Sequence, residues 1–317
     1  MFVGVKVGIV GSGAVGSYYG ARLARSGCDV VFLLRSDWEV VMRRGFSIEE
    51  QTEESFQIYP VRGYRRTEEM GTCDLVIIAL KATSREALRQ LLPPLLGPET
   101  AVVALQNGLG NEEWLARGFP NRAILGGIVF ACLTRTGPGK VKNTGFGKIE
   151  LGSHRGSDTA LLQDVAALFE RAEVPCAVVA SLEAARWRKL AWNIPFNGIS
   201  VAAGGCDVGE ILRDSELRRL TVGLMEEIAA VAARHELPLP EGWIERMMAD
   251  TARMGPYRPS SLLDFLAGRA IEVEAIWGEP LRRAQRAGVL TPRLQTIYAL
   301  LRALDRRANT PQGITPS

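Results

Sequence analysis

The first half of the chain alternates short, almost entirely apolar runs with segments that suit helices. The runs cover residues 7–10, 30–34, 73–80, 100–105 and 123–132. Strands that are buried on both faces of a parallel sheet have this composition, whereas strands with one wet face alternate apolar and polar residues. Because helix-compatible segments separate the runs, the pattern predicts repeated β-α-β units and an α/β domain.

Two further changes of pattern divide the rest of the chain. Glycine-interrupted alternation over residues 139–152 is typical of a hairpin, which we expect at the sheet edge. From residue 181 onward only helical periodicity is found. The chain is therefore predicted to have an α/β domain over 1–180 and an all-α domain over 181–317, with its last ten residues disordered. The helices expected in the second domain cover 182–193, 215–234, 241–254, 260–265, 272–287 and 293–307.

A glycine-rich turn lies in the first β-α-β unit, where residues 7–10 lead into Gly11-Ser-Gly-Ala-Val-Gly16. Gly11 suits a tight turn, Gly13 lets a pyrophosphate approach the backbone, and Gly16 lets the helix pack on the strand. A pyrophosphate would accept hydrogen bonds from the free N–H groups at the helix N-terminus. The turn predicts a dinucleotide site, and the alternative is a structural turn without a ligand.

The residue after the second strand distinguishes the two nicotinamide cofactors. NAD-binding proteins usually carry Asp or Glu there, which bonds the ribose 2′-hydroxyl, but this chain has Arg35 followed by Ser36. A guanidinium can bind a 2′-phosphate through two hydrogen bonds. Arg35 therefore favours NADP(H), against the alternative of a surface arginine at a strand end.

Composition excludes several classes of function. The 317 residues carry a net charge of only +3, and the basic residues are scattered, so no nucleic-acid partner is expected. No apolar stretch is long enough for a membrane span, and the N-terminus leads directly into a strand without a signal peptide. Five widely spaced cysteines indicate reduced thiols in the cytoplasm, and with two histidines no metal site is predicted.

The segment 183–197 carries the most concentrated candidate chemistry of the second half. Lys189, Asn193 and Asn197 follow at i, i+4 and i+8 and therefore share one helical face, although Pro195 makes the last spacing approximate. A polar line on a helix rich in Leu, Trp and Phe faces solvent or lines a cleft. The pattern alone favours the solvent face, with a cleft as the alternative.

Over its whole length the chain resembles the ketopantoate reductase (2-dehydropantoate 2-reductase) family. The glycine turn alone would not identify the family, but the motifs together are specific. The motifs that carry the resemblance are the glycine turn with Arg35, Leu80-Lys81-Ala82, Gln106-Asn107-Gly108, Trp187 to Asn193 with Asn197, Pro259-Ser260-Ser261, Gly268-Arg269 with Glu272, Arg282-Arg283-Ala284 and Thr291-Pro292.

The resemblance implies a Rossmann-type NADP-binding domain, a helical catalytic domain and NADPH-dependent reduction of a 2-oxo acid in pantothenate biosynthesis. It implies that Lys189 protonates the ketone oxygen and that Glu272 helps to hold the active site. By itself Glu272 would be interpreted as a surface carboxylate. Substrate contacts are implied for Asn107, Asn193, Asn197 and Ser260. Cofactor contacts are implied for Gly11, Ser12, Gly13, Ala14, Val15, Gly16, Arg35, Lys81, Asn107, Cys132 and Glu272.

Two departures from the family pattern leave the substrate open. Asp207 stands where the pathway enzymes usually have another asparagine, and a carboxylate there would repel an anionic substrate unless it is turned away or protonated. Residues 130–132 lack the polar groups often found after that strand. The alternatives are a relative that reduces another small 2-oxo acid or ketone and a non-catalytic NADP(H) sensor. Trp243 and Tyr257, expected to be exposed, hint at a homodimer.

Overall fold

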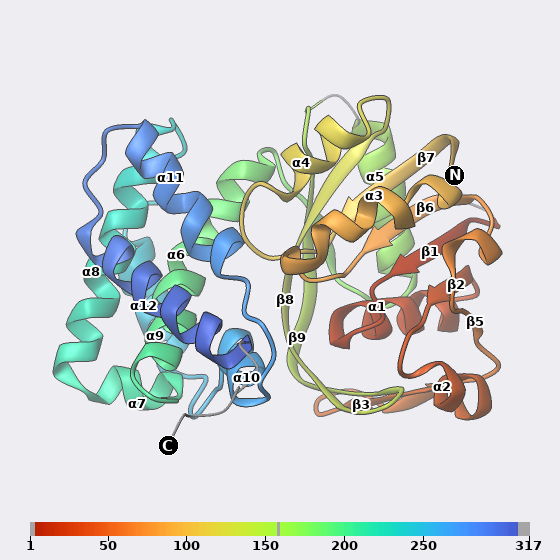
Figure 1. Cartoon of the computed structure of the whole chain (residues 1–317), viewed down its shortest axis with the longest axis horizontal. Helices are drawn as coiled ribbons and strands as arrows, with labels where there is room; N and C mark the ends of the chain where they lie inside the picture. The colour runs from red at the N-terminus through yellow and green to blue at the C-terminus, as the bar shows by residue number, and fades with distance from the viewer. Residues whose placement is uncertain (1–3, 157–158, 310–317) are drawn as a thin grey trace, which may run out of the picture. The chain divides into compact units, whose positions relative to one another are not determined.

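The computed structural model describes residues 4–156 and 159–309, which form two compact units (Figure 1). The first, here called the sheet unit, comprises Met1–Gln106 and Asn111–Leu182. The second, the helical unit, comprises Asn107–Gly110 and Glu183–Ser317. The short segment Asn107–Gly110 thus belongs to the helical unit although it lies within the first half of the sequence. The two units are described separately below.

The described part of the sheet unit contains a ten-stranded sheet with the order β4-β3-β9-β8-β7-β6-β1-β2-β5, and β10 pairs with β9. Neighbouring strands from β8 to β5 are parallel, whereas β8 and β9 form an antiparallel hairpin. The strands are β1 (Lys6–Val10), β2 (Asp29–Leu33), β3 (Phe46–Glu50), β4 (Phe56–Ile58), β5 (Arg62–Tyr64), β6 (Cys73–Ile78), β7 (Leu96–Ala104), β8 (Ile124–Gly137), β9 (Lys140–Ser153) and β10 (Cys176–Val178).

Successive residues of the central strands enter two separate apolar cores, one on each face of the sheet. In β6, Leu75 and Ile77 join the core that includes α1 (Ala14–Arg25) and α5 (Thr159–Arg171). Val76 and Ile78 join the core that includes α3 (Leu88–Leu91) and α4 (Asn111–Gly118). This two-sided burial explains the continuous apolar runs of the sequence and confirms the predicted Rossmann-type α/β fold. The remaining helical elements of this unit are α2 (Trp38–Arg44) and the 3₁₀ turns at Thr67–Glu69, Ala82–Ala87 and Pro93–Leu95.

The hairpin predicted over residues 139–152 at the sheet edge is wrong in two respects, because these residues form the single strand β9, which makes a hairpin with β8, and this hairpin is not at the edge. Strand β9 also pairs with β3, and β3 pairs with β4, so the hairpin lies inside the sheet. Strand β3 carries Phe46, Ile48 and Glu50 on its buried side. A carboxylate at a core position breaks the apolar period that predicts strands, which is why the sequence pattern misses β3.

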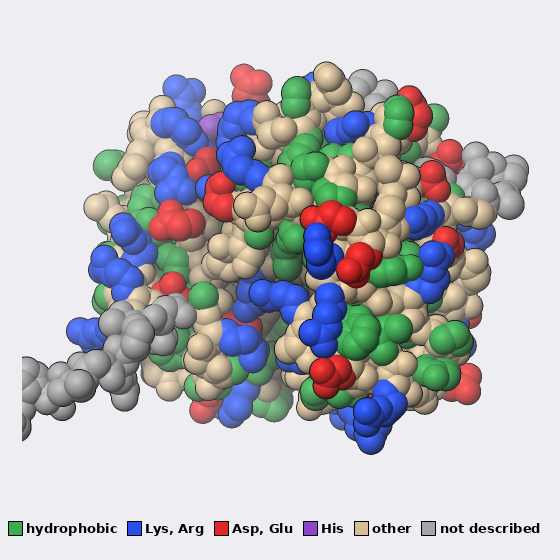
Figure 2. Space-filling view, turned by 45° about the vertical axis from the view of Figure 1, so that its right-hand side comes forward, with side chains coloured by type: hydrophobic (Ala, Val, Ile, Leu, Met, Phe, Trp, Pro, Cys, Tyr) green, Lys and Arg blue, Asp and Glu red, His purple; other side chains and the backbone are tan. Residues whose placement is uncertain are grey.

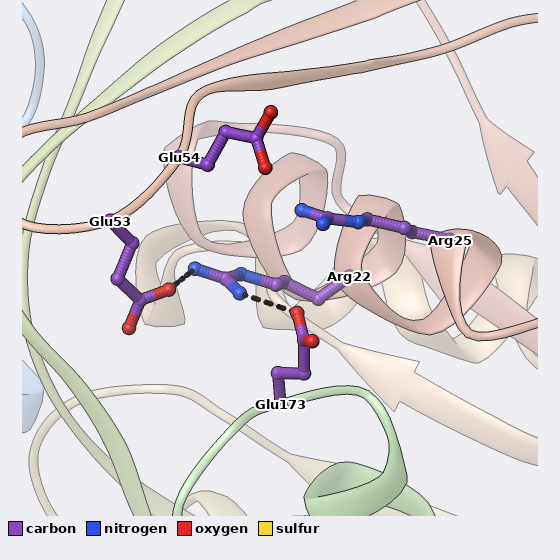
Figure 3. Close-up of a pocket in the computed structure, with 5 residues that line it drawn as sticks. All are labelled: Arg22, Arg25, Glu53, Glu54 and Glu173. Atoms are coloured by element: carbon purple, nitrogen blue, oxygen red, sulfur yellow. Dashed lines mark hydrogen bonds and ion pairs between the residues drawn. The ribbon is translucent and has the colours of Figure 1, made fainter.

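Glu50 is accommodated because a buried cation, Arg22, neutralises it. The Arg22 guanidinium is 2% exposed and bonds to the carboxylates of Glu50, Glu53 and Glu173. Glu50 also accepts a 2.9 Å hydrogen bond from Nδ2 of Asn143 in β9. Burial acts to lower the pKa of the Arg22 guanidinium, and the bonds to Glu53 and Glu50 outweigh this effect and raise it. The adjoining pocket is lined by Arg22, Arg25, Glu53, Glu54 and Glu173 (Figure 3).

Figure 1 shows the helices of the second unit, which surround one apolar core. Two short elements, α7 and a π-helical turn, were not predicted, and the turn replaces the first part of the helix expected over 272–287. Among the described residues, none of the helices in either unit is long and apolar enough to cross a membrane. The helices are α6 (Leu182–Ala202), α7 (Val208–Arg213), α8 (Ser215–Arg234), α9 (Trp243–Ala252), α10 (Ser260–Leu266), the π turn η4 (Glu274–Gly278), α11 (Glu279–Arg286) and α12 (Pro292–Asn309).

Helix α6 runs to Ala202, nine residues beyond its predicted end, and Pro195 lies inside it. A proline in a helix removes one N–H donor and costs about 3 kcal/mol. Phe196, Ile199 and Val201, which follow it, are all buried in the core. Burial of three such side chains contributes roughly 1.5–3 kcal/mol each, which outweighs the cost of the proline.

Two other expectations for the helical unit are corrected. Trp243 is only 8% exposed and packs in the core, and Tyr257 is half-buried with its ring 6.3 Å from that of Trp192. Both aromatic rings are therefore accounted for by packing within this unit. Helix α12 continues to Asn309, and the rest of the segment predicted to be disordered lies outside the described residues.

The segment Asn107–Gly110 is fixed against the π turn. The backbone N–H of Leu109 donates a 2.9 Å hydrogen bond to the carbonyl of Ala275. Gly108 has a φ of +86°, and a Cβ added there would lie 2.3 Å from the same carbonyl oxygen. Position 108 therefore requires glycine for two reasons, its positive φ and its close approach to the Ala275 carbonyl.

Replacement of the buried cation, Arg22→Leu, is expected to lower the free energy of unfolding by about 3 kcal/mol, because it leaves the Glu50 carboxylate buried without its cation. The matched control is Arg25→Ala, which removes an exposed guanidinium from the same pocket and should cost less than about 1 kcal/mol. Urea unfolding of the two variants and the parent measures both effects. Equal losses would contradict the central role of Arg22.

The close approach at position 108 is tested by Gly108→Ala with Gly110→Ala as its control. Both glycines have a φ of +86°, so both variants carry the same backbone strain of roughly 1 kcal/mol. A Cβ at position 110 meets its nearest atom, Cγ of Glu279, at an ordinary 3.6 Å. Gly108→Ala should therefore lose about 1–3 kcal/mol more unfolding free energy than Gly110→Ala in urea titrations. Similar losses would show that the contact with Ala275 is not restrictive.

Candidate active site

The glycine turn joins β1 to α1 in a conformation that only glycine permits at two of its positions. Gly11 has a φ of +107°, and a Cβ there would lie 2.4 Å from the backbone nitrogen of Leu80. A Cβ at Gly16 would lie 2.0 Å from the carbonyl oxygen of Gly11. At Gly13 an added Cβ would meet nothing within 4 Å, so the backbone there is open to an approaching ligand.

The N-terminus of α1 has the features of an anion site. Gly13 is the N-cap and offers no side-chain oxygen to the first N–H groups, and the first turn contains no acidic residue. Between them, Ala14, Val15 and Gly16 supply N–H groups that have no partner inside the helix. The Ser12 hydroxyl is turned to the carbonyl of Leu33, 2.8 Å away. The helix dipole and these N–H groups suit the pyrophosphate predicted from the sequence.

Three other predicted cofactor residues lie on or after strands of the same sheet. Arg35 is exposed two residues after the end of β2, and the half-buried Lys81 follows β6 at the N-cap of a 3₁₀ turn. Strands β2, β1 and β6 are parallel neighbours, so their carboxyl ends lie at one edge, where such sheets bind ligands. Cys132 is half-buried on β8, and its carbonyl accepts a 3.3 Å hydrogen bond from the Thr144 hydroxyl.

In the helical unit, three of the predicted residues form a connected chain of hydrogen bonds. Nζ of Lys189 donates to Oδ1 of Asn107 at 2.8 Å. Nδ2 of Asn107 lies 3.4 Å from Oε2 of Glu272, to which it donates. Glu272 is 8% exposed, which excludes the alternative of a surface carboxylate. These hydrogen bonds join residues from α6, from the 107–110 segment and from the stretch before the π turn. Turns of the π type are frequent at functional sites.

The substrate residues predicted on α6 share the Lys189 face, because the helix continues through Pro195. Asn193 and Asn197 are 6% and 1% exposed, so this part of the face is buried and not solvated. Oδ1 of Asn197 accepts from the backbone N–H of Ser261 at 2.9 Å, and the exposed Ser260 hydroxyl lies 3.4 Å from the same oxygen. Because Oδ1 is used in this way, Nδ2 is the atom of Asn197 that can face a ligand.

Asp207, the departure that cast doubt on an anionic substrate, has a local structural role. Its carboxylate accepts a 2.8 Å hydrogen bond from the backbone N–H of Glu210, and Glu210 in turn accepts one from the backbone N–H of Asp207. This reciprocal pair is a capping box at the start of α7. The spacing of an acidic residue three positions before Glu is a signal in the sequence that predicts such a cap.

Several features near these residues were not predicted. Nε1 of Trp277 donates a 3.0 Å hydrogen bond to the carbonyl of Ile194, and Gly198 makes room for the indole, since a Cβ there would lie 3.0 Å from the same nitrogen. In the sheet unit, Arg135 bonds to the carboxylate of Asp37. Neither pair has a signal in the sequence, because each joins residues far apart in the chain.

Charge and metal-binding side chains give no competing site among residues 4–156 and 159–309. There, no group of three or more His, Cys, Asp or Glu side chains is arranged to hold a metal ion. On the face shown in Figure 2, Lys and Arg are interspersed with Asp and Glu. The pocket beside Arg22 contains the carboxylates of Glu53 and Glu173, which are bonded to the Arg22 guanidinium (Figure 3). These carboxylates balance the buried positive charge and are thereby accounted for.

Models of one protein family match both halves of the chain. Residues 7–156 match the family "Ketopantoate reductase PanE/ApbA", and residues 181–305 match its C-terminal family. A curated protein of a Nostoc species, named 2-dehydropantoate 2-reductase, is 38% identical over 97% of each chain.

Solved structures extend the similarity to the fold. A 2-dehydropantoate 2-reductase from Geobacter metallireducens has a TM-score of 0.91 and 40% identity, and covers 94% of this chain and 99% of its own. The enzyme of the same name from Methylococcus capsulatus has a TM-score of 0.89 and 34% identity, with 97% and 99% covered. Both family matches and these relatives show that the chain belongs to the ketopantoate reductase family.

Proposed function

We propose that the chain is an NADPH-dependent 2-dehydropantoate 2-reductase, which reduces ketopantoate to pantoate in pantothenate biosynthesis. The observation that carries the proposal is the hydrogen-bonded chain of Lys189, Asn107 and Glu272. The names of the relatives from Nostoc, Geobacter and Methylococcus support the same reaction. We assign residues 1–180 to cofactor binding and residues 181–317 to catalysis and substrate binding.

Ketone reduction requires a hydride for the carbonyl carbon and a proton for its oxygen. NADPH supplies the hydride when it is bound, and Nζ of Lys189 donates the proton to the oxygen, which would otherwise become an alkoxide. Asn107 accepts a hydrogen bond from Nζ and thereby fixes its position. Glu272 fixes the Asn107 amide from the opposite side. A pre-positioned proton donor of this kind lowers the barrier without any reorganisation during the reaction.

The carboxylate of a 2-oxo acid needs donors that bind it without neutralising Lys189. Asn193 and the Nδ2 atom of Asn197 can supply such neutral donors, and the Ser260 hydroxyl can do so when it turns away from Oδ1 of Asn197. The capping role of Asp207 reduces the expected repulsion, because its carboxylate is held at the start of α7, where the helix N–H groups and dipole partly offset its charge. These features support a small anionic substrate on the face of α6 that carries Lys189.

For the cofactor we assign the pyrophosphate to the turn Gly11–Gly16, the adenosine 2′-phosphate to Arg35 and Lys81, and the nicotinamide end to Cys132, Asn107 and Glu272. We further propose a cytoplasmic enzyme that forms a homodimer. A Staphylococcus aureus relative with 25% identity and a TM-score of 0.80 is described as a dimeric ketopantoate reductase, which supports the second point.

The reaction is tested by following NADPH oxidation with ketopantoate and a panel of other 2-oxo acids and ketones. We expect ketopantoate to give the highest kcat/KM. A higher value for another member of the panel would assign the chain to a different substrate. NADPH binding without turnover of any member would indicate a sensor and overturn the proposed reaction.

Lys189→Ala should lower kcat by about 10²–10⁴-fold and leave NADPH affinity within about twofold, because the proton donor acts only in the transition state. Lys189→Arg is the matched control: it keeps the positive charge, but the guanidinium does not release its proton. It should remain slow while retaining substrate affinity better than Lys189→Ala. Recovery of turnover in Lys189→Arg, or equal losses of turnover and NADPH affinity in Lys189→Ala, would contradict the role as general acid.

A further inference from the structure

A carboxylate lies close to the predicted 2′-phosphate site. Asp37 follows Arg35 by two residues and is 6% exposed. Two residues span at most about 7 Å of backbone, so Asp37 lies close to the point of the chain from which the Arg35 side chain extends. A carboxylate in this region binds the ribose 2′-hydroxyl in NAD-dependent proteins and would repel a 2′-phosphate. A free Asp37 would therefore oppose the cofactor selection made by Arg35.

Both oxygens of Asp37 are occupied by donors, and Arg135 of β8 supplies two of them. Nε of Arg135 donates to Oδ2 at 3.1 Å, and its Nη2 bonds Oδ1. The backbone N–H of Gly139, at the hairpin tip, donates to Oδ2 at 3.1 Å, and the Ser36 hydroxyl donates to Oδ1 at 3.0 Å. Two parallel bonds from one guanidinium give this pair a fixed geometry as well as charge neutrality.

This engagement replaces the usual role of an aspartate at such a position. Asp37 is the N-cap of α2, where its side chain would normally accept a hydrogen bond from the first turn and contribute about 1 kcal/mol. It makes no such capping bond. The carboxylate is instead turned to a guanidinium 98 residues away in the sequence. A pair exposed on both sides would contribute little; here the Arg135 side chain is 42% exposed, but the Asp37 side chain is only 8% exposed.

We propose that Arg135 is a specificity-determining residue for the cofactor, which acts by neutralising Asp37 beside the 2′-phosphate-binding Arg35. The proposal rests on the proposed function, because it presupposes that NADPH binds with its 2′-phosphate at Arg35. Arg135 keeps the potential at this end of the sheet positive and withholds Asp37 from a 2′-hydroxyl. It thus favours NADPH and disfavours NADH at once.

The test measures dissociation constants for NADPH and NADH by fluorescence titration of the full-length chain. Arg135→Ala should lower the NADPH-over-NADH preference by about tenfold or more, since it exposes an anion next to a phosphate. Arg135→Lys keeps the charge and should retain most of the preference. Lys142→Ala is the matched control, because it removes a cation from the same hairpin that pairs with Glu49 and not with Asp37. It should leave the preference unchanged.

A double variant separates neutralisation of Asp37 from direct phosphate binding. Asp37→Asn combined with Arg135→Ala removes the anion as well, so it should recover the preference to within about threefold of the parent. A double variant as poor as Arg135→Ala, or an unchanged preference in Arg135→Ala, would overturn the proposal. Equal weakening of both cofactors would likewise overturn it and indicate a structural role.

Arg35→Ala serves as the reference for the proposed function itself. If the parent prefers NADPH and the Arg35→Ala variant does not, the assignment of the 2′-phosphate to Arg35 is supported. The Arg135 variants then test only the present inference. If the parent binds neither cofactor, or prefers NADH, the proposed function fails first. The two failures are therefore distinguishable in one set of titrations.

Discussion

The candidate chemistry depends on the orientation of one amide, that of Asn107. A lysine ammonium can only donate hydrogen bonds, and an ionised carboxylate can only accept them. An asparagine placed between the two satisfies both only when its oxygen faces Lys189 and its nitrogen faces Glu272, as observed. The two charged groups thus fix the amide, and the amide fixes the Lys189 nitrogen. A polar side chain without two such partners could rotate and would not fix the position of the Lys189 nitrogen in the same way.

The backbone around Asn107 is built to maintain this arrangement. Gly108 allows the segment to lie against the carbonyl of Ala275, which lies only three residues after Glu272. The π turn that follows Glu272 presents this carbonyl to the N–H of Leu109. A second contact fixes the same stretch to the helix of Lys189, through the bond from Trp277 to the carbonyl of Ile194. Lys189, Asn107 and Glu272 are therefore all positioned by packing and not by a mobile loop.

Sequence patterns predicted the parts of the molecule that depend on local or periodic constraints. Two-sided burial gives continuous apolar runs, so the parallel strands β1, β2, β6, β7 and β8 were found, and the glycine turn was found because its backbone tolerates no other residue at Gly11 and Gly16. Strand β3 was missed because Glu50 occupies a core position whose charge is neutralised by a distant arginine. The helix α6 was predicted too short because the local penalty of Pro195 is outweighed by burial of the residues after it. In these two cases, a long-range contact overrode a local preference.

The same distinction governs how a carboxylate near a ligand site should be interpreted. Asp207 and Asp37 both stand where a negative charge would oppose a predicted anionic ligand, and both are engaged by donors. The donor for Asp207 lies three residues away, so its capping box is visible in the sequence. The donor for Asp37 comes from another strand, and no local pattern shows it. The formal charge of a carboxylate in the sequence therefore does not by itself exclude an anionic substrate or cofactor. Its hydrogen-bond and ion-pair partners in the fold must be known first.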